Sequence, residues 1–290
     1  MRCREKVRLP QDETVASWST SVSTMHPIEH LRYVARATGA DPVALVSETA
    51  QALFGLHMEP AGLVLAARRI VERHPTCAPL WWLCAQALSA LDPFERLYEL
   101  ESEIDKDATT DHLLAHISEA QTVCIVGWSP TALEALVQRG DCKVLVIDSF
   151  GSADSAVNAL ERVQVEAESV SIEHAARAIE MCDMVVLDAL GCGPDEFLMT
   201  SGSHGVAALA YVAQKPAVVT ARRGTRLPAE LWESMKSRNF DPQRPWRTEV
   251  DVVPRELLRA VVGPQGIVDA SLSVVAECAP TTEMLVRSAM

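Results

Sequence analysis

The sequence predicts an α/β protein in which a Rossmann-like parallel sheet, covered by helices, follows a smaller all-helical N-terminal domain. From residue 121 onward, short apolar runs alternate with segments of helical spacing, the pattern of parallel strands joined by helical crossovers. Between residues 26 and 119 the apolar residues instead recur with the spacing of helices alone. The length of 290 residues suits about two domains.

The composition is that of a chain that buries a core, and it excludes several classes of function. Hydrophobic residues make up 48% and charged residues 22% of the chain, a balance that excludes disorder for most of it. The net charge of −13 disfavours a surface that coats nucleic acid, because neutralising phosphates needs a basic face. No uncharged apolar stretch is long enough to span a membrane, and the N-terminus lacks the apolar run of a secretion signal.

The eight cysteines are scattered and form no CxxC pair. Tetrahedral zinc sites usually draw on closely paired ligands, so we expect no metal. Reduced, buried thiols fit a cytoplasmic protein. His112 and His116 lie four residues apart and share a helix face, but no third ligand is evident nearby. We interpret them as an ordinary packed or exposed pair.

The helical part divides into a flexible tail over residues 1–24 and a domain over residues 25–119. Five helices are expected in this domain, and a proline lies near the first turn of each. The fifth opens with Asp92, followed three residues later by Glu95, a capping-box pattern. The helices begin at or near His26, Pro42, Pro60, Pro79 and Pro93.

Two adjacent tryptophans, Trp81 and Trp82, lie in the fourth predicted helix. Neighbouring residues point about 100° apart on a helix. Either both side chains lie in an internal core, or one of them faces a neighbouring domain or a partner chain.

The α/β domain is expected over residues 120–270, with six strand-like runs. Right-handed crossovers between such runs give a doubly wound sheet, in which ligands bind beyond the carboxyl ends of the strands. The residues directly after each run are therefore the candidates for a binding site. The runs span residues 122–127, 143–148, 166–171, 183–190, 216–221 and 248–253.

The first two runs are followed by short polar turns. Gly127 allows close approach of the backbone, and Ser129 is a predicted N-cap, so free amides at this helix start could hold a phosphate; the alternative is a plain strand-to-helix turn. Asp148, followed by Ser149, either accepts hydrogen bonds from sugar hydroxyls or caps the next helix. The GxGxxG fingerprint is absent, so no dinucleotide cofactor is indicated.

The fourth and fifth runs are followed by further candidates. Asp188 is expected to be nearly buried, which requires hydrogen-bond partners, and the glycines and proline after it predict a tight irregular loop. The Gly202-Ser203-His204 stretch is a second small-residue helix start that could hold an anion. Arg222 and Arg223, with Arg226 beyond them, suit bidentate phosphate binding or salt bridges to the acidic surface. Because all these turns share one edge of the sheet, together they indicate a phosphorylated small molecule.

The order of these segments resembles that of the initiation factor 2B alpha/beta/delta family. The family includes regulatory subunits of the translation factor and isomerases that act on methylthioribose 1-phosphate and ribose 1,5-bisphosphate. The resemblance covers about residues 118–270. It is carried by VCIVGWSPTALEAL, VLVIDS, AARAIEMCDMVVLDALGCGPDEFLMTSGSHGVAALA, PAVVTARRGTRLP and VPRELLRAVVGPQGIVD.

The resemblance implies a role for several positions and also reveals departures. The family turn after the first strand is similar to Gly127-Trp128-Ser129, but the isomerases carry a catalytic cysteine where this chain has Gly127. The family's acidic residue and serine after the next strand resemble Asp148 and Ser149. The isomerase aspartate resembles Asp188, displaced by one position, and a one-residue shift turns a strand side chain to the other face. The glycine and hydroxyl of a further family segment persist as Gly202 and Ser203, while its Asn and Lys do not.

The first interpretation is a non-catalytic regulatory protein like the initiation factor 2B subunits, which binds a sugar phosphate or nucleotide and no direct nucleic acid. The second is a sugar-phosphate aldose–ketose isomerase, with Asp188 aided by Cys192 as a substitute thiol or His204 as a substitute base. The third is a scaffold subunit without a ligand. The resemblance also implies a homodimer or higher oligomer formed through the Rossmann-like domain, to which residues 271–290 could contribute.

Overall fold

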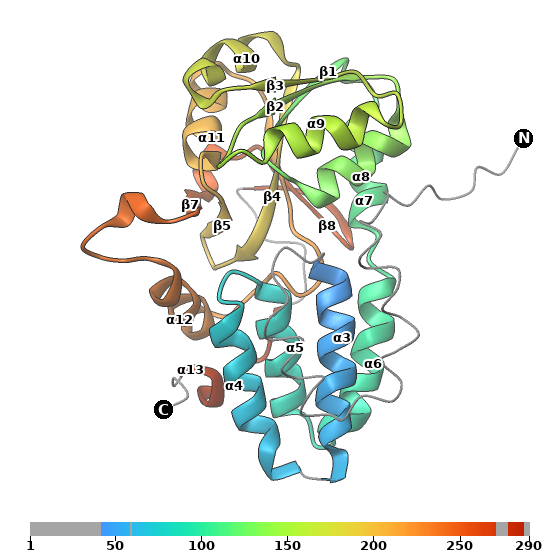
Figure 1. The fold of residues 1–290 in the computed structure, drawn as a ribbon, viewed down its shortest axis with the longest axis vertical. Coiled ribbons are helices and arrows are strands. Elements are labelled where there is room, and N and C mark those ends of the chain that lie inside the picture. The colour runs from blue at the N-terminus through green and yellow to red at the C-terminus, as the bar shows by residue number, and fades with distance from the viewer. Residues whose placement is uncertain (1–41, 59, 271–277, 287–290) are drawn as a thin grey trace, which may run out of the picture.

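The computed structural model describes residues 42–58, 60–270 and 278–286. Figure 1 shows helices α3 to α6 gathered at one end and the sheet with its covering helices at the other. The first predicted helix (26–39), the expected tail and the apolar positions 272–275 lie outside the described residues. Among the described residues, no helix is long and apolar enough to cross a membrane.

The helical end confirms four of the five predicted helices. Asp92 caps the last of them as its sequence predicts, because its Oδ1 accepts hydrogen bonds from Phe94 N at 2.9 Å and Glu95 N at 3.1 Å. The helices are α3 Pro42–Phe54, α4 Leu63–Arg73, α5 Ala78–Ser89 and α6 Pro93–Asp105, with 3₁₀ turns η2 Gly55–Met58 and η3 Pro60–Gly62 after α3.

Helix α5 lies at the centre of the helical core, since it is apolar on nearly every side. Trp81 and Trp82 are both fully buried. Trp82 also lies against Gly224, whose added Cβ would meet the indole ring at 3.3 Å. Gly224 follows strand β6 (Ala217–Thr220) of the α/β part, so one of the two tryptophans does face the other part of the chain, within a continuous core.

The main sheet has the strand order β3-β2-β1-β4-β6-β8-β9, and all its pairs are parallel except β8 with β9. The order reverses between β1 and β4, because the chain adds β2 and β3 on one side and later strands on the other. The carboxyl ends of β1 and β4 therefore form the topological switch point of the sheet. The first four strands are β1 Thr122–Val126, β2 Lys143–Ile147, β3 Ala167–Val170 and β4 Met184–Cys192.

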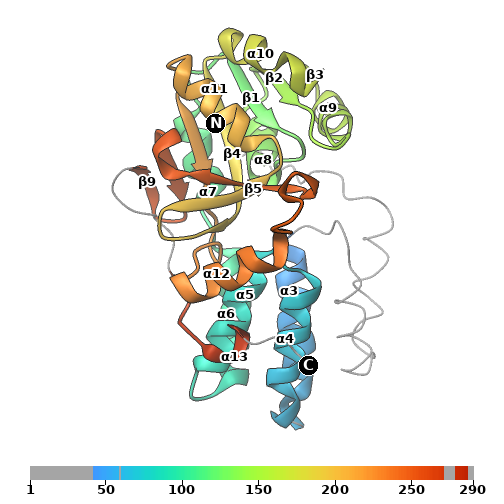
Figure 2. The same ribbon diagram turned by 90° about the vertical axis from the view of Figure 1, so that its left-hand side faces the viewer.

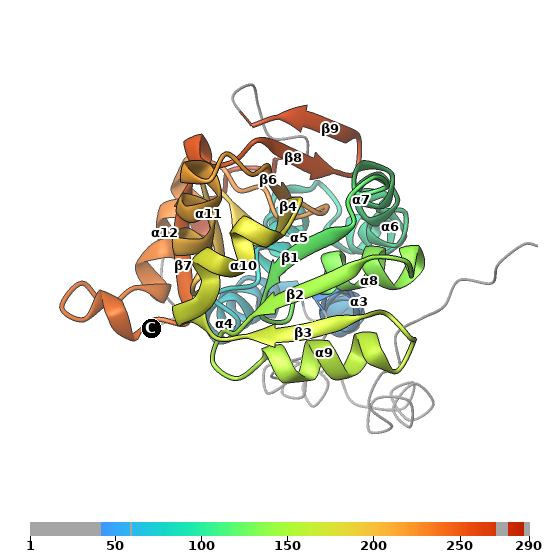
Figure 3. The ribbon, with the colours of Figure 1, turned by 90° about the horizontal axis from the view of Figure 1, so that it is seen from above.

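Helices cover both faces of this sheet, as apolar strands on two sides predict (Figures 1 and 3). Along β1, Val123 and Ile125 face one hydrophobic cluster, while Cys124 and Val126 face another. Helices α7 Thr109–His116, α8 Pro130–Arg139 and α9 Ala153–Glu161 belong to the first cluster, and α10 Ala175–Met181 and α11 Ser203–Val212 to the second.

Three strands were not predicted, and one predicted loop is wrong. The stretch after Asp188 is not a tight irregular loop: β4 continues to Cys192, and the chain turns and returns antiparallel as β5. Gly191 and Gly193 serve close packing instead, because an added Cβ would meet Ala78 Cβ at 3.1 Å or the Trp232 ring at 2.5 Å. The unpredicted strands are β5 Glu196–Thr200, β8 Ala260–Gly263 and β9 Gly266–Asp269.

The sixth predicted run forms β7 (Val250–Pro254), but this strand lies off the main sheet. It pairs antiparallel with β5, so that β4, β5 and β7 make a second, smaller layer. This layer bends from the main sheet toward the helical end (Figures 1 and 2). Two short 3₁₀ turns flank β7: η5 Pro245–Arg247 before it and η6 Arg255–Leu257 after it, and η4 Ile172–His174 precedes α10.

Later parts of the chain return to the helical end. Helix α12 (Ala229–Asn239) places Trp232 and Met235 in the same hydrophobic cluster as α3 to α6. The short α13 (Glu283–Val286) contacts α4, α5 and α12 and buries Leu285 (Figure 2). The described part of the predicted C-terminal contact segment is thus packed within its own chain, with Met284 left half-exposed.

Candidate site at the carboxyl edge of the sheet

Gly127 ends β1 at the switch point and adopts a left-handed conformation with φ +53°. A Cβ added there would lie 2.6 Å from Ser152 Oγ and 3.2 Å from Ser149 Cβ. The left-handed region is also unfavourable for any residue with a side chain. The geometry of this turn therefore leaves no room for a side chain at position 127.

Asp188, on β4 beside this turn, is partly buried, and both oxygens of its carboxyl group accept hydrogen bonds from the chain. Its Oδ2 accepts from Thr131 N at 2.8 Å, and its Oδ1 accepts from Thr220 Oγ1 at 2.8 Å. Burial raises the pKa of this carboxyl, opposed by the two hydrogen bonds and the Arg222 charge. Asp188 therefore acts as the anion at the start of α8, where the helix dipole favours a negative charge.

The amides at the start of α8 are consequently not all free, contrary to the expectation of an open phosphate cradle. Ser129 is the N-cap residue as predicted, but its hydroxyl makes no capping bond and instead donates to Val126 O at 2.9 Å. Ser129 is also buried, whereas its neighbour Trp128 is 43% exposed. The turn thus satisfies its own polar groups and presents an indole to solvent.

Asp148 and Ser149, after β2, are also used within the chain. Asp148 accepts hydrogen bonds from Gly151 N and Ala153 N, both at 3.1 Å, so its alternative role as a helix cap is the one observed. The Ser149 hydroxyl donates to Ser201 O at 2.8 Å. This bond joins the end of β2 to the turn after β5, segments 52 residues apart in the sequence.

The predicted anion cradle at Gly202-Ser203-His204 holds a carboxylate from the same chain. Gly202 has φ +95° and caps α11. Asp251 Oδ2, from β7, accepts from Gly202 N at 2.8 Å and from His204 N at 3.1 Å. Asp251 was not predicted from the sequence; the signal was a carboxylate between two valines, Val250 and Val252, inside the strand-like run 248–253.

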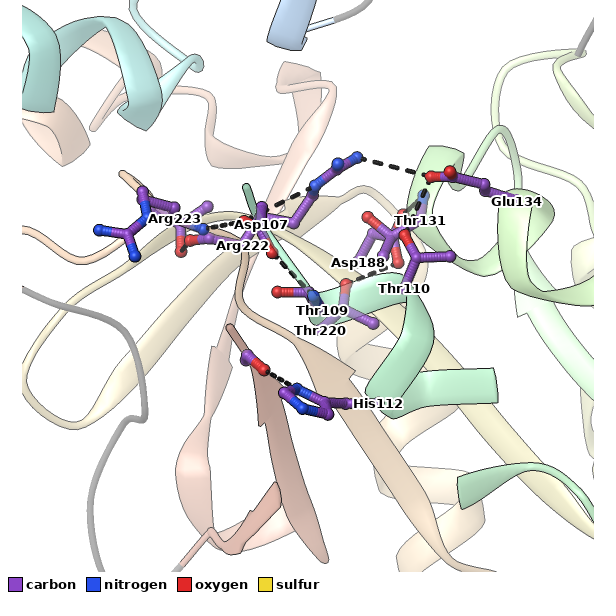
Figure 4. A network of polar contacts seen from close by, with 12 residues as sticks. Asp107, Thr109, Thr110, His112, Thr131, Glu134, Asp188, Thr220, Arg222 and Arg223 are labelled. Carbon is purple, nitrogen blue, oxygen red and sulfur yellow. Dashed lines mark hydrogen bonds and ion pairs between the residues drawn. The ribbon is translucent and has the colours of Figure 1, made fainter. Parts of the chain in front are cut away.

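The arginines after β6 lie near acidic side chains of α6, of α8 and of the connection after α6 (Figure 4). Arg222 lies 4.0 Å from both Asp107 and Glu134, and Arg223 NH1 lies 3.5 Å from Glu103 Oε2. Asp107 also accepts the backbone hydrogen bond of Arg223. The salt-bridge alternative is therefore observed, although Arg222 Nε is buried and has no hydrogen-bond partner among the described residues.

The proposed substitute groups for catalysis occupy different environments. Cys192 is fully buried, and burial raises the pKa of its thiol to about 12, so the thiolate is scarce at neutral pH. His204 is exposed at the start of α11. His112 Nδ1 donates to Gly263 O at 2.8 Å, which fits the ordinary packed histidine expected from the sequence.

The contacts arrange the predicted residues in two groups around the switch point. Gly127, Ser149 and Gly202 adjoin one another through Ser152, Ser201 and Val126. Asp188 and Arg222 belong to a second group with Thr131, Thr220 and Glu134 (Figure 4). Three helix starts at this edge carry an aspartate of the chain, namely Asp148, Asp188 and Asp251.

Two hollows of the described surface lie away from this edge. One, of about 330 Å³, adjoins α12 and the β4–β5 turn, and another, of about 710 Å³, adjoins the amino ends of β1 and β2. Within residues 42–58, 60–270 and 278–286, no group of three or more side chains could hold a metal ion.

These features define a class: a parallel α/β sheet behind a helical N-terminal part, with its carboxyl edge closed by the chain's own carboxylates. Comparison with known proteins shows which of them share this fold. No family model matches the chain, and no curated protein matches it in sequence. Solved structures do match, and they confirm the resemblance to initiation factor 2B proteins at the level of the fold.

Three of these structures illustrate the likeness. Translation initiation factor eIF-2B from Pyrococcus horikoshii OT3 superposes with a TM-score of 0.67 at 16% identity, over 84% of this chain and 96% of that one. The tetrameric eIF2B-β2δ2 complex from C. thermophilum gives 0.67 at 15%, over 89% and 96%. The 5-methylthioribose 1-phosphate isomerase from P. horikoshii OT3 gives 0.60 at 14%, over 84% of each chain. The fold is thus shared with regulatory subunits and with an enzyme.

Proposed function

We propose that this chain is a non-catalytic protein of the initiation factor 2B regulatory type, which acts by associating with a second copy or with related subunits. The fold it shares with eIF-2B chains, one of them in a tetrameric complex, supports the assignment to this type. Because the isomerase shares the fold as well, the choice between the two rests on the carboxyl edge of the sheet.

The observation that carries the proposal is the absence of space for a side chain at Gly127. Aldose–ketose isomerisation needs an acid and a base within reach of C1 and C2 of the sugar. The thiol position of the isomerases is closed here by Ser152 Oγ at 2.6 Å from the added Cβ. The carboxylate position is filled by Asp188, whose oxygens both accept hydrogen bonds from the chain. The thiol is therefore missing from its position, and both oxygens of the carboxyl group are already engaged by the chain.

A second candidate function is binding of a phosphorylated small molecule at the same edge, as the sequence led us to expect. One observation favours it: Arg222 Nε is buried without a hydrogen-bond acceptor, and a bound phosphate oxygen would supply one. Against it, the helix starts at this edge already carry Asp148, Asp188 and Asp251, and an anion would be repelled by them.

Two measurements on the purified chain test these proposals. Incubation with methylthioribose 1-phosphate and with ribose 1,5-bisphosphate should give no ketose product, while the P. horikoshii isomerase on its own substrate serves as the positive control. Turnover that is abolished in Asp188→Asn would establish the isomerase interpretation instead.

Sedimentation equilibrium of the chain alone should show self-association at micromolar concentration. A chain that stays monomeric would count against the proposal that it acts by associating with a second copy.

Thermal unfolding separates the second candidate from a scaffold without a ligand. A sugar phosphate or nucleoside monophosphate that binds the folded chain at 100 times its Kd stabilises it by about 2.7 kcal/mol. The rise in Tm should disappear in Arg222→Lys, which keeps the charge but loses the Nε donor. If none of these compounds raises the Tm, association without a small-molecule ligand remains the proposed function.

A further inference from the structure

The connection between α12 and β7 projects from the body of the molecule. Figures 1 and 3 show it extending away from α12 and from the small β5–β7 layer. All seven residues from Asp241 to Arg247 are exposed, and we call this segment the finger. Trp246, in the 3₁₀ turn η5 of the finger, is 77% exposed. A large exposed aromatic side chain on a projecting loop is the usual form of an interaction site.

The finger is held in one shape by its own hydrogen bonds. Gln243 N donates to Asp241 Oδ1 at 2.8 Å, and Arg247 N donates to Arg244 O at 3.0 Å, closing two successive turns. Pro245 starts the second turn, which is a 3₁₀ helix through Arg247, and proline fixes its backbone angle. A loop ordered before binding loses little conformational entropy when it docks.

The chemistry of the finger is basic and aromatic. Arg244 and Arg247 flank Trp246, and neither guanidinium makes an ion pair with the described residues. Tryptophan and arginine are the residue types that most often dominate the binding energy of protein interfaces. In a chain with a net charge of −13, two unpaired cations beside an exposed indole select an acidic partner surface that also offers apolar contact.

A surface of this kind exists on the same chain, in the hollow of about 330 Å³ beside α12. Its apolar walls are Pro194, Pro254 and the buried Trp232. Four carboxylates line it, those of Asp195, Glu196, Glu233 and Glu256. Two cations pair with members of this set, Lys236 with Glu196 and Glu233, and Arg255 with Asp195, so the surroundings keep a net negative charge.

We propose that the finger of one copy docks in this hollow on a second copy, with Trp246 against the proline and tryptophan walls and the arginines facing the carboxylates. Both features belong to one unit: the hollow uses the start of α12 and the end of β7, and the finger connects their other ends. A two-fold axis beside this unit places each finger in the partner's hollow and closes the assembly. The inference deepens the proposed function, on which it rests, by naming the surface of association.

Truncation of the indole tests the docking. Trp246→Ala should raise the dissociation constant of the dimer at least about 30-fold, the effect of a hot-spot residue, while the circular dichroism spectrum of the folded chain stays unchanged, because the side chain is exposed. Tyr98→Ala is the matched control: Tyr98 is equally exposed, at 75%, but lies on α6, and its loss should leave the constant unchanged. Sedimentation equilibrium measures both.

A charge exchange tests the receptor side. Arg247→Glu should weaken the dimer, and the added change Glu256→Arg should restore at least part of the loss, since it rebuilds an ion pair of reversed sign. Failure of the second change to restore binding would overturn the hollow as the receptor. A dimer whose dissociation constant is within threefold of wild type in Trp246→Ala would overturn the finger, while leaving the proposed function intact.

Two further results are informative. A wild-type chain that stays monomeric would overturn the inference and the proposed self-association together. An arginine–tryptophan loop also resembles sites that stack on single-stranded nucleic acid. Binding of an oligodeoxythymidine that depends on Trp246, beside an unaffected dimer, would replace the protein partner with a nucleic acid.

Discussion

Substitution of Gly127 by alanine tests the geometry on which the functional assignment depends. The left-handed φ of +53° costs a residue with a Cβ about 1–2 kcal/mol. The new Cβ would meet Ser152 Oγ at 2.6 Å, and that hydroxyl can move only by giving up its hydrogen bond to Ser149 O, worth about 0.5–1.5 kcal/mol. We therefore expect Gly127→Ala to lower the free energy of unfolding by about 2–3 kcal/mol.

Urea unfolding followed by circular dichroism measures this loss, and a double-mutant cycle divides it. Ser152→Gly removes the clash, so Gly127→Ala should cost only about 1–2 kcal/mol in that background. Gly205→Ala is the matched control, because a Cβ at Gly205 meets nothing within 4 Å and alanine is the better helix former. A cost of Gly127→Ala below about 0.5 kcal/mol would refute the reasoning, because the turn would then accept a side chain, and the isomerase interpretation would regain its thiol position.

Three further predictions follow from the same edge of the sheet. Burial raises the pKa of Asp188, so its contribution to stability is present below the carboxyl's ordinary pKa and is lost as pH rises through the folded-state pKa. The unfolding free energy of wild type relative to Asp188→Asn should therefore fall between pH 4 and pH 7, and a difference that grows with pH would contradict this. Asp251→Ala should cost about 0.5–2 kcal/mol by uncapping α11, and Asp251→Asn, which keeps an oxygen acceptor, clearly less; equal losses would show that capping is not its role. Cys192, with a pKa of about 12 and no exposure, should resist thiol reagents in the native state and react only after unfolding. Mass spectrometry should find the half-buried Cys77 and Cys278 modified before Cys192, and equal rates would contradict the burial of Cys192.

The strand and helix pattern was readable from the sequence because it is local. All six predicted runs are strands, and each described helix of the N-terminal part begins near its expected residue. The β4–β5 hairpin escaped prediction because its glycines suggested a loop, whereas Gly193 is needed where the Trp232 ring approaches within 2.5 Å of an added Cβ. That requirement comes from a helix some forty positions further along the chain, and no local pattern reports it.

The candidate site shows the same division between local and long-range information. The sequence by itself determined which polar residues lie at the carboxyl edge, since the strand period places Gly127, Asp148 and Asp188 there. Only the tertiary structure decided what these residues do. Asp251 arrives at the start of α11 from β7, and Asp107 reaches Arg222 from the connection after α6. A buried charge must find a partner wherever the fold provides one, and the partners of Asp251 lie 47 and 49 residues away in the sequence.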